Sequence, residues 1–331
     1  MLMASIASAE WYEQTSTAMT TRVELVFWYD DVAIAKRIGR NVLQEFDRIE
    51  AEMSSYRDDS ELSAVNLKAA EQAVSVSHEL YFVLEQAQRV SELSQGAFDI
   101  TFASAGYLYD FRHARQPGSA KLKAELAHIN YRNVLLDKTS HTVRFQLPGV
   151  RVDLGGIAKG YAVDKGIEML KRSGIEHARL SAGGDMRLLG DKRGKPWMVG
   201  VKNPRSDDRH AVALPLADVA ISTSGDYERF FIDDSGERIH HILSPKTGRP
   251  VKGVQSTTVI GVDAVTTDGL STAIFVLGVE RGLAMINRLP GIDAIIIDSQ
   301  RKLHFSDGLM DPGLVERNES DRPRDNLLHT N

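Results

Sequence analysis

The chain has 331 residues, 42% of them hydrophobic, and its 40 Lys and Arg against 45 Asp and Glu give a formal net charge of −5. Such a chain can bury a substantial core, which excludes an intrinsically disordered protein. The mildly acidic balance offers no basic stripe for a phosphate backbone, so nucleic-acid binding is not expected. The absence of Cys excludes disulfides, thiolate metal sites, Cys nucleophiles and a lipoprotein anchor attached through Cys.

The two ends of the chain differ from the rest. The beginning, MLMASIASAEW, is a short apolar stretch with no preceding basic residue, and it fits a remnant of a secretory signal and a frayed terminus equally well. We predict an N-terminal tail or signal remnant over 1–17, one folded domain over 18–311 and a polar C-terminal tail over 312–331. No run approaches the roughly 18 to 20 apolar residues of a membrane-spanning helix, so no transmembrane segment is expected.

The hydrophobic spacing predicts a mixture of strands and helices. Residues 23–28 indicate an opening strand, and apolar residues at steps of three and four indicate helices over 34–53 and 80–90. Two more helices are predicted, one over 159–173 that Gly174 terminates, and one from about Asp268 with a break near Gly278. Short strands are predicted over 142–145, 150–154, 185–189, 197–201, 219–223, 229–233, 257–262 and 294–298. Because strands and helices do not alternate regularly, the pattern favours an α+β fold with mixed or antiparallel sheets.

The segment VDLGGIAKGYAVD at 152–164 places a Gly-rich turn between an apolar strand and a helix. Free backbone N–H groups and the positive end of a helix bind anions. Lys159 can add its charge to a phosphate, and Asp153 can accept a hydrogen bond from a ribose or a base. The spacing matches neither a Walker A loop nor a dinucleotide fingerprint. Alternatively, the glycines serve only the close packing of a strand and a helix.

The segment TDGLSTAIFVLG at 267–278 places Asp268 and Thr272 four residues apart, on one face of a helix. A carboxylate and a hydroxyl can hold Mg²⁺ together with an exposed carbonyl of the Gly-rich turn. Taken alone, this segment favours another interpretation. Asp268 would then be the N-cap of its own helix, and Thr272 would bond back to a carbonyl.

Three further segments carry candidate site residues. In QGAFDIT at 95–101, Phe98 and Asp99 could grip a flat heterocycle, or they could be a core Phe and a turn Asp. After the first helix, Tyr56 is a candidate stacking residue and Ser60 is the expected N-cap of a short helix. Of the ten histidines, His241 is the one whose surroundings, before a proline-bounded turn, suggest a site.

In this order, the segments resemble the ApbE family, the FAD:protein FMN transferases, which cleave FAD and attach FMN through a phosphoester bond to a Thr or Ser of a target protein. The resemblance spans 18–309. It implies a single α+β domain of the T-fold-like kind. It rests on AMT at 18–20, MSSYRDDSELSAVN, GAFDIT, DLGGIAKGYAVD, SAGGDMRLLG at 181–190, TSGDYERFFI with HHILSPKTGRPV, and TTDGLSTAIFVLG.

The resemblance also implies a site. Mg²⁺ would be held by the Gly156 carbonyl, Asp268 and Thr272, and the implied catalytic residues are His241, as the base for the acceptor hydroxyl, and Lys159. The residues implied to contact FAD are Met19, Tyr56, Ala97, Phe98, Asp99, Asp153, Lys159 and the backbone around Ile242. The expected reaction is Mg²⁺-dependent transfer of FMN with release of AMP. The alternative is an FAD-binding protein, or an FAD pyrophosphatase that uses water and gives FMN and AMP.

The family also suggests a partner and a location. The acceptor would carry a motif of the Asp/Ser-Gly-x-Thr/Ser-x-Ala kind and could be a subunit of a redox complex. Export to the bacterial periplasm or cell envelope is therefore expected, and a cytoplasmic location stays open. Thr20, Ser244 and Gly269 replace the family's usual Gly, Asp and Ala; none removes a predicted Mg²⁺ ligand, but they put the placement of the substrate in question.

Overall fold

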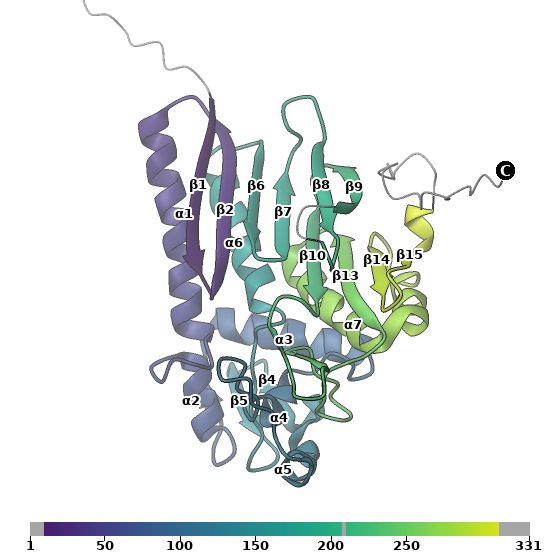
Figure 1. The fold of residues 1–331 in the computed structure, drawn as a ribbon. Coiled ribbons are helices and arrows are strands. Elements are labelled where there is room, and N and C mark those ends of the chain that lie inside the picture. The colour runs from purple at the N-terminus through teal and green to yellow at the C-terminus, as the bar shows by residue number, and fades with distance from the viewer. Residues whose placement is uncertain (1–9, 207–209, 311–331) are drawn as a thin grey trace, which may run out of the picture.

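The computed structural model describes residues 10–206 and 210–310. An eight-stranded sheet crosses the molecule (Figure 1), and each neighbouring pair of its strands runs antiparallel. This confirms the predicted α+β class with antiparallel sheets. In spatial order the strands are β1 (Glu10–Ala18), β2 (Thr21–Tyr29), β6 (Ala178–Ala182), β7 (Asp185–Leu189), β10 (Ala220–Gly225), β13 (Val254–Gly261), β14 (Asp293–Asp298) and β15 (Leu303–Phe305).

Four long helices build the main core with this sheet. α1 (Val32–Met53) packs on β1 and β2, α6 (Ala158–Arg172) packs on β6 and β7, and α7 (Ala264–Ile286) packs on β10 and β13. α3 (His78–Leu93) lies against α7. Within the described part of the chain, α7 alone is long and apolar enough to span a membrane, a test that the core helix of a soluble protein also passes.

The remaining elements are short. A hairpin of β8 (Trp197–Lys202) and β9 (His210–Leu216) forms a second apolar cluster with β2, β7 and β10. The others are β3 (Val74–Ser75), β4 (Val134–Asp137), β5 (Thr142–Phe145), β11 (Phe230–Ile232), β12 (Arg238–His240), α2 (Glu61–Lys68), α4 (Ala103–Gly106), α5 (Ser119–Glu125), η1 (Ile100–Phe102), η2 (Leu126–His128), η3 (Tyr131–Asn133) and η4 (Asp307–Leu309).

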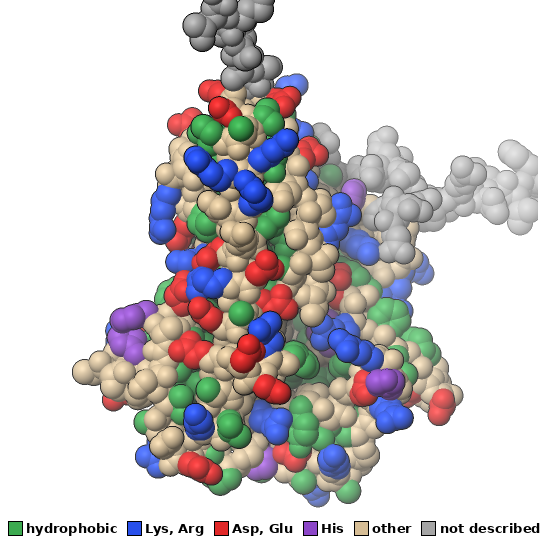
Figure 2. Space-filling model, turned by 90° about the vertical axis from the view of Figure 1, so that its left-hand side faces the viewer, with side chains coloured by type: hydrophobic (Ala, Val, Ile, Leu, Met, Phe, Trp, Pro, Cys, Tyr) green, Lys and Arg blue, Asp and Glu red, His purple; other side chains and the backbone are tan. Residues whose placement is uncertain are grey.

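Helix α1 shows how the sequence dictates the first of these layers. The side chain of Asp31 accepts hydrogen bonds from the N–H groups of Ala33 and Ile34 at 2.8 and 3.0 Å and so caps the helix. Figure 2 shows Lys and Arg side chains gathered where α1 begins and Asp and Glu side chains further along. This charge order opposes the helix dipole. The stability of α1 therefore comes from its cap and its buried apolar face, with each fully buried side chain contributing about 1.5–3 kcal/mol.

The structure corrects the N-terminal boundary. Residues 10–17 are not a tail, because they belong to β1, whose 9 residues pair with β2. Trp11 packs edge-on against Trp28 and Trp197, with ring centroids 5.5 and 5.3 Å apart. This edge strand carries polar residues between its few apolar ones, so its sequence shows no clear hydrophobic alternation. The MLMASIASA stretch at 1–9 and the tail predicted at 312–331 lie outside the described residues.

The strand predicted at 150–154 is also wrong, although the segment is buried. Side chains satisfy the backbone of Arg151 and Val152 in place of a neighbouring strand. Asn66 accepts from the N–H of Val152 at 2.8 Å and donates to its carbonyl at 2.9 Å. The hydroxyl of Ser104 accepts from the N–H of Arg151 at 2.9 Å.

The turn between β1 and β2 stores strain that can be removed. Met19 and Thr20 have φ of 51° and 60°, as both central residues of a type I′ turn require, and Gly or Asn is preferred there over a β-branched residue. We expect Thr20→Gly to raise the free energy of unfolding by about 1 kcal/mol in urea titrations. Thr21→Gly, in the neighbouring strand, should lower it. A loss of stability in Thr20→Gly would mean that the 3.3 Å bond from Arg229 to the Thr20 hydroxyl outweighs the strain.

Candidate active site

A buried charge cluster forms where α6, β7 and α7 meet. The Nζ atom of Lys159 lies 2.8 Å from Oδ2 of Asp185 and 3.3 Å from Oδ2 of Asp268. The same Asp268 oxygen accepts a hydrogen bond from the N–H of Gly160 at 3.0 Å. Asp185 and Asp268 are only 2% and 3% exposed. The Gly-rich segment and the α7 segment therefore do come together, joined through Lys159 and Gly160.

The electrostatics of the cluster favour a bound cation. Burial raises the pKa of Asp268 and the charge of Asp185 raises it further, while Lys159 acts in the opposite direction. Burial alone would lower the pKa of Lys159, but the two carboxylates outweigh it and hold that pKa above its usual value. Two carboxylates around one ammonium group leave an excess negative charge that a cation can compensate.

Two of the predicted Mg²⁺ ligands, Gly156 and Thr272, lie close together, and the third, Asp268, is one helical turn from Thr272. A Cβ atom placed on Gly156 would be 3.4 Å from Oγ1 of Thr272, so the Gly-rich turn faces the α7 hydroxyl directly. Asp268 precedes Thr272 by one turn of α7. Carboxylate, hydroxyl and carbonyl oxygens are the donors that a hard cation such as Mg²⁺ prefers. The residues present therefore fit a magnesium ion.

The start of α7 differs from the prediction. The helix begins at Ala264, and its N-cap is Asp263, whose side chain accepts from the N–H of Thr266 at 2.9 Å. The interpretation of Asp268 as a cap is therefore wrong, because Asp268 lies inside the helix. The predicted break is confirmed, since Gly278 has φ 78° and ψ −178° within α7.

His241 is held in one orientation by the backbone. Its Nδ1 atom lies 3.2 Å from the carbonyl oxygen of Arg229, and its own N–H donates to the same oxygen at 3.1 Å. A carbonyl can only accept, so Nδ1 carries the proton and the lone pair is on Nε2. Burial lowers the pKa of His241 to about 4, and the charges of Arg229 and Lys159 act in the same direction. The imidazole is therefore neutral at pH 7 and can accept a proton.

Three residues implied to contact FAD, Met19, Tyr56 and Asp153, lie outside the helices and strands. Asp153 accepts from the Ser55 hydroxyl at 2.5 Å and from the N–H of Gly155 at 2.8 Å. Tyr56 leaves 83% of its surface exposed, yet protein around its hydroxyl and the charge of Asp153 raise its pKa. The N–H of Met19 donates to the Glu50 carboxylate at 2.6 Å. Asp153 and Tyr56 are thus within electrostatic range of each other.

In the turn at residues 97–99, both carboxylate oxygens of Asp99 are occupied by hydrogen bonds from the backbone. Oδ1 of Asp99 accepts from the N–H of Thr101 and Oδ2 accepts from the N–H of Tyr131, both at 2.8 Å. Phe98 is 4% exposed, and its ring edge would lie 3.2 Å from a Cβ atom on Gly156. The observed geometry is therefore that of the alternative interpretation, in which Phe98 is a core residue and Asp99 a turn residue. The ring of Phe98 packs against the Gly-rich turn at Gly156.

The other two residues implied to contact FAD are enclosed by protein. Ala97 is 9% exposed and Ile242 is 5% exposed. The N–H of Ile242 donates to Nδ1 of His240 at 3.3 Å, and its carbonyl accepts from the N–H of Val251 at 3.1 Å. Their backbones border the site, but the structure already provides Ile242 with hydrogen-bond partners.

Comparison with known proteins shows the family of the chain. A sequence profile of the ApbE family matches residues 19–296. The chain belongs to the ApbE family. An FAD:protein FMN transferase of Treponema pallidum is 35% identical over 277 residues, which cover 78% of this chain and 76% of the relative. One from Klebsiella pneumoniae is 32% identical over 299 residues, covering 89% and 92%. The crystal structure of the ApbE protein of Thermotoga maritima superposes with a TM-score of 0.83 at 35% identity, covering 90% of this chain and 98% of that one.

Two residues of this ApbE site were not predicted. Asp185 lies within SAGGDMRLLG, where the sequence indicates no role for it, although its contact to Lys159, at 2.8 Å, is shorter than that of Asp268. Ser224 lies 3.1 Å from Thr272, oxygen to oxygen. One feature of the sequence could have pointed to Asp185: it is a charged residue that directly follows Gly183 and Gly184 at the start of a buried strand. A Cβ atom on Gly184 would lie 2.4 Å from the Thr223 carbonyl oxygen, so the approach of β7 to β10 requires this glycine.

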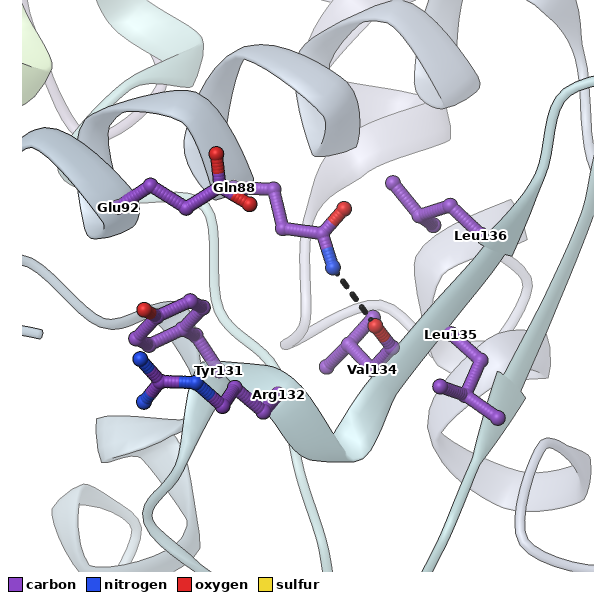
Figure 3. A pocket seen from close by; sticks show the side chains of 7 residues that line it. All are labelled: Gln88, Glu92, Tyr131, Arg132, Val134, Leu135 and Leu136. Atoms are coloured by element: carbon purple, nitrogen blue, oxygen red, sulfur yellow. Dashed lines mark hydrogen bonds between the residues drawn. The ribbon is translucent and has the colours of Figure 1, made fainter.

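A separate cavity of about 440 Å³ lies between α3 and β4. Figure 3 shows Gln88 reaching across it to donate to the carbonyl of Val134, at 2.8 Å. The lining residues are Gln88, Glu92, Tyr131, Arg132, Val134, Leu135 and Leu136. None of the predicted site residues of this ApbE protein is among them.

Proposed function

We propose that the protein is an Mg²⁺-dependent FAD:protein FMN transferase. It would cleave the pyrophosphate of FAD, attach FMN through a phosphoester bond to a Thr or Ser of a target protein, and release AMP. The observation that carries this proposal is the cluster of Lys159, Asp185 and Asp268 beside the Gly-rich turn. The names of the relatives, FAD:protein FMN transferases, support the reaction class.

The residues around the cluster have separate tasks in this reaction. The carbonyl of Gly156, the carboxylate of Asp268 and the hydroxyl of Thr272 would hold Mg²⁺, and the ion would supply neutralisation of phosphate charge and polarisation of the phosphorus. Lys159, oriented by Asp185 and by the Gly155 carbonyl at 3.1 Å, adds a fixed positive charge for the pyrophosphate. Tyr56, Asp153 and the turn at Met19 would contact the rest of FAD at the entrance.

His241 would supply the base. An acceptor hydroxyl is almost fully protonated at neutral pH, so its attack requires removal of the proton. The neutral imidazole takes that proton on Nε2 while the new oxygen–phosphorus bond forms and the bond to the AMP leaving group breaks. The Arg229 carbonyl keeps the ring in the tautomer that this task requires.

Mass spectrometry of an acceptor tests the proposal. The protein is incubated with FAD, Mg²⁺ and a peptide of the Asp-Gly-x-Thr-x-Ala kind, with and without a chelator. A mass gain of one FMN on the peptide, with release of AMP only when Mg²⁺ is present, is the expected result. If free FMN and AMP appear and the peptide mass does not change, water is the acceptor and the protein is an FAD pyrophosphatase.

Substitution of His241 separates catalysis from binding. We expect His241→Asn to reduce FMN transfer at least about a hundredfold while leaving the dissociation constant for FAD unchanged. For the wild type, a base with a pKa of about 4 is unprotonated at all higher pH values, so the transfer rate should fall only in acid, near that value. His113→Asn, at an exposed position, serves as the control. Full activity of His241→Asn would exclude this role, whereas an acid limb near the ordinary histidine pKa would mean that burial does not lower the pKa of His241.

A further inference from the structure

Arg229 lies beside the base of the proposed reaction. The N–H of His241 donates to the carbonyl of Arg229 at 3.1 Å, which extends the pairing of β11 with β12 by one residue, since Phe230 lies opposite His240. Residues that lie opposite each other in an antiparallel pair share a face. The side chains of Arg229 and His241 are therefore on the same face. Burial lowers the pKa of His241, and the charge of Arg229 acts in the same direction, as a cation near the imidazole does.

A hydrogen bond holds the far end of this side chain. The Nη2 atom of Arg229 donates to the hydroxyl of Thr20 at 3.3 Å. The turn that carries Thr20 is itself fixed, because the N–H of Met19 donates to the Glu50 carboxylate of α1 at 2.6 Å. The side chain of Arg229 thus connects the β11–β12 hairpin with the β1–β2 turn. A side chain that is already held in place loses less conformational entropy when it binds a ligand.

Thr20 makes this bond in a strained conformation. Its φ of 60° is unfavourable for a β-branched residue, and strained residues of this kind cluster at active sites and ligand-binding sites. The residue is exposed, so burial of apolar surface does not explain why a threonine is there. Its hydroxyl, which accepts from Arg229, does explain it.

The charge of Arg229 is not compensated by an acid. Lys159 is shared by Asp185 and Asp268, whereas Arg229 forms no salt bridge with an acid among the residues that the structure describes, and its bond to Thr20 goes to a neutral group. A guanidinium presents its N–H donors in a planar fork that fits two oxygen atoms of a phosphate. The charge and the fork of Arg229 are therefore both available to a bound anion.

The phosphorus that is transferred must come close to His241. An acceptor oxygen within about 3 Å of the base and about 3–3.5 Å from the phosphorus places that phosphorus within about 6.5 Å of Nε2. As the new oxygen–phosphorus bond forms and the bond to the AMP oxygen breaks, the electron pair leaves with AMP and negative charge is spread over the non-bridging oxygens. These oxygens are an anion that a guanidinium on the face of His241 can reach.

We propose that Arg229 binds the non-bridging oxygens of the transferred phosphorus and that Thr20 holds the guanidinium in position for this contact. Arg229 is then a further catalytic residue, and Thr20 is a positioning residue. Lys159 approaches the pyrophosphate from the buried cluster, and Arg229 approaches it from the β1–β2 turn. The inference rests on FAD as the substrate of the proposed function.

Binding of FAD to Arg229→Gln tests the contact. The dissociation constant is measured from flavin fluorescence without acceptor and without Mg²⁺, so that no bond of FAD is cleaved. It should rise about tenfold or more, because a charge-assisted bond is lost, while the backbone carbonyl that orients His241 remains.

Arg112→Gln is the matched control. Arg112 is also exposed, and its charge, like that of Arg229, opposes the rise in the pKa of Tyr56 that burial causes. Its dissociation constant for FAD should stay within about twofold of the wild type, since an exposed charge without a direct contact contributes little. An unchanged constant in Arg229→Gln, or an equal rise in Arg112→Gln, overturns the phosphate contact.

Two variants of Thr20 separate positioning from stability. Thr20→Gly removes the hydroxyl together with the strain, so the dissociation constant for FAD should rise about threefold although the protein becomes more stable. Thr20→Ser keeps the hydroxyl and should restore the affinity. An unchanged affinity in Thr20→Gly, or equal losses in the two variants, overturns the role of Thr20. Because these constants are measured without the acceptor, a wild type that binds FAD but transfers no FMN would overturn the proposed function and leave the phosphate contact standing.

Discussion

Replacing Asp268 with asparagine is expected to abolish FMN transfer and to stabilise the protein in the absence of metal. The rate should fall about a thousandfold or more, since the change removes the carboxylate from the cation site while the shape of the side chain is retained. The amide oxygen can still accept from the N–H of Gly160, so the packing of α6 on α7 is preserved. Mass spectrometry of the acceptor and a thermal melt of each protein measure the two effects.

The gain in stability has an electrostatic cause. Asp185 and Asp268 share one ammonium group, Lys159, so in the metal-free protein the ionised form of Asp268 is a buried negative charge without a partner of its own, and burial and the charge of Asp185 raise the pKa of Asp268 to about 7. Asp268→Asn removes this charge and leaves one carboxylate for one ammonium group. The midpoint of thermal unfolding should therefore rise in the variant and no longer increase when Mg²⁺ is added. Such a gain at the expense of activity is common at functional sites.

Asp263→Asn provides the control for this experiment. Asp263 lies on the same helix but caps its beginning, and asparagine caps helices about as well as aspartate does. Transfer and stability should both stay close to the wild-type values. Substantial transfer by Asp268→Asn would place the cation elsewhere, and a lower midpoint would mean that the Lys159–Asp268 attraction exceeds the cost of burying the second carboxylate.

The helices could be predicted because their signals are local. The spacing in α1 places Ile38, Val42 and Phe46 on one face, and all three are buried. Gly174 has φ 79°, which is the conformation that ends helices such as α6. The segment at 150–154 has the same apolar alternation as a strand, but the backbone groups of Arg151 and Val152 bond to side chains distant in the sequence, and no spacing rule reveals them.

The site residues, too, could be predicted only where their signals are local. Asp268 and Thr272 could be paired from their spacing, because four residues on a helix always share a face. Asp185 could not be assigned, since its contact with Lys159 exists only where β7 meets α6 in the folded protein. The start of α7 was misplaced because two aspartates, Asp263 and Asp268, both precede apolar residues. Only the backbone shows that the first of them is the cap.

The close contact between α6 and α7 leads to the second large effect. A Cβ atom on Gly160 would lie 2.1 Å from the carbonyl oxygen of Ala264 and 2.9 Å from Cβ of Asp268. Both are fixed parts of α7, so Gly160→Ala must push the helices apart. We expect a loss of about 3 kcal/mol in the free energy of unfolding, even though alanine favours a helix over glycine by about 1 kcal/mol.

This separation should also disable the site. Moving α7 away from α6 breaks the bond from Gly160 to Asp268 and changes the distance from Lys159 to the same carboxylate, so transfer should fall even below the unfolding temperature. Gly166→Ala is the matched comparison on α6, because its new Cβ would meet the tip of the Leu180 side chain at 2.3 Å, which can rotate away. Urea titrations and transfer rates should show the smaller loss in Gly166→Ala; equal effects would mean that helix packing at Gly160 does not position Asp268.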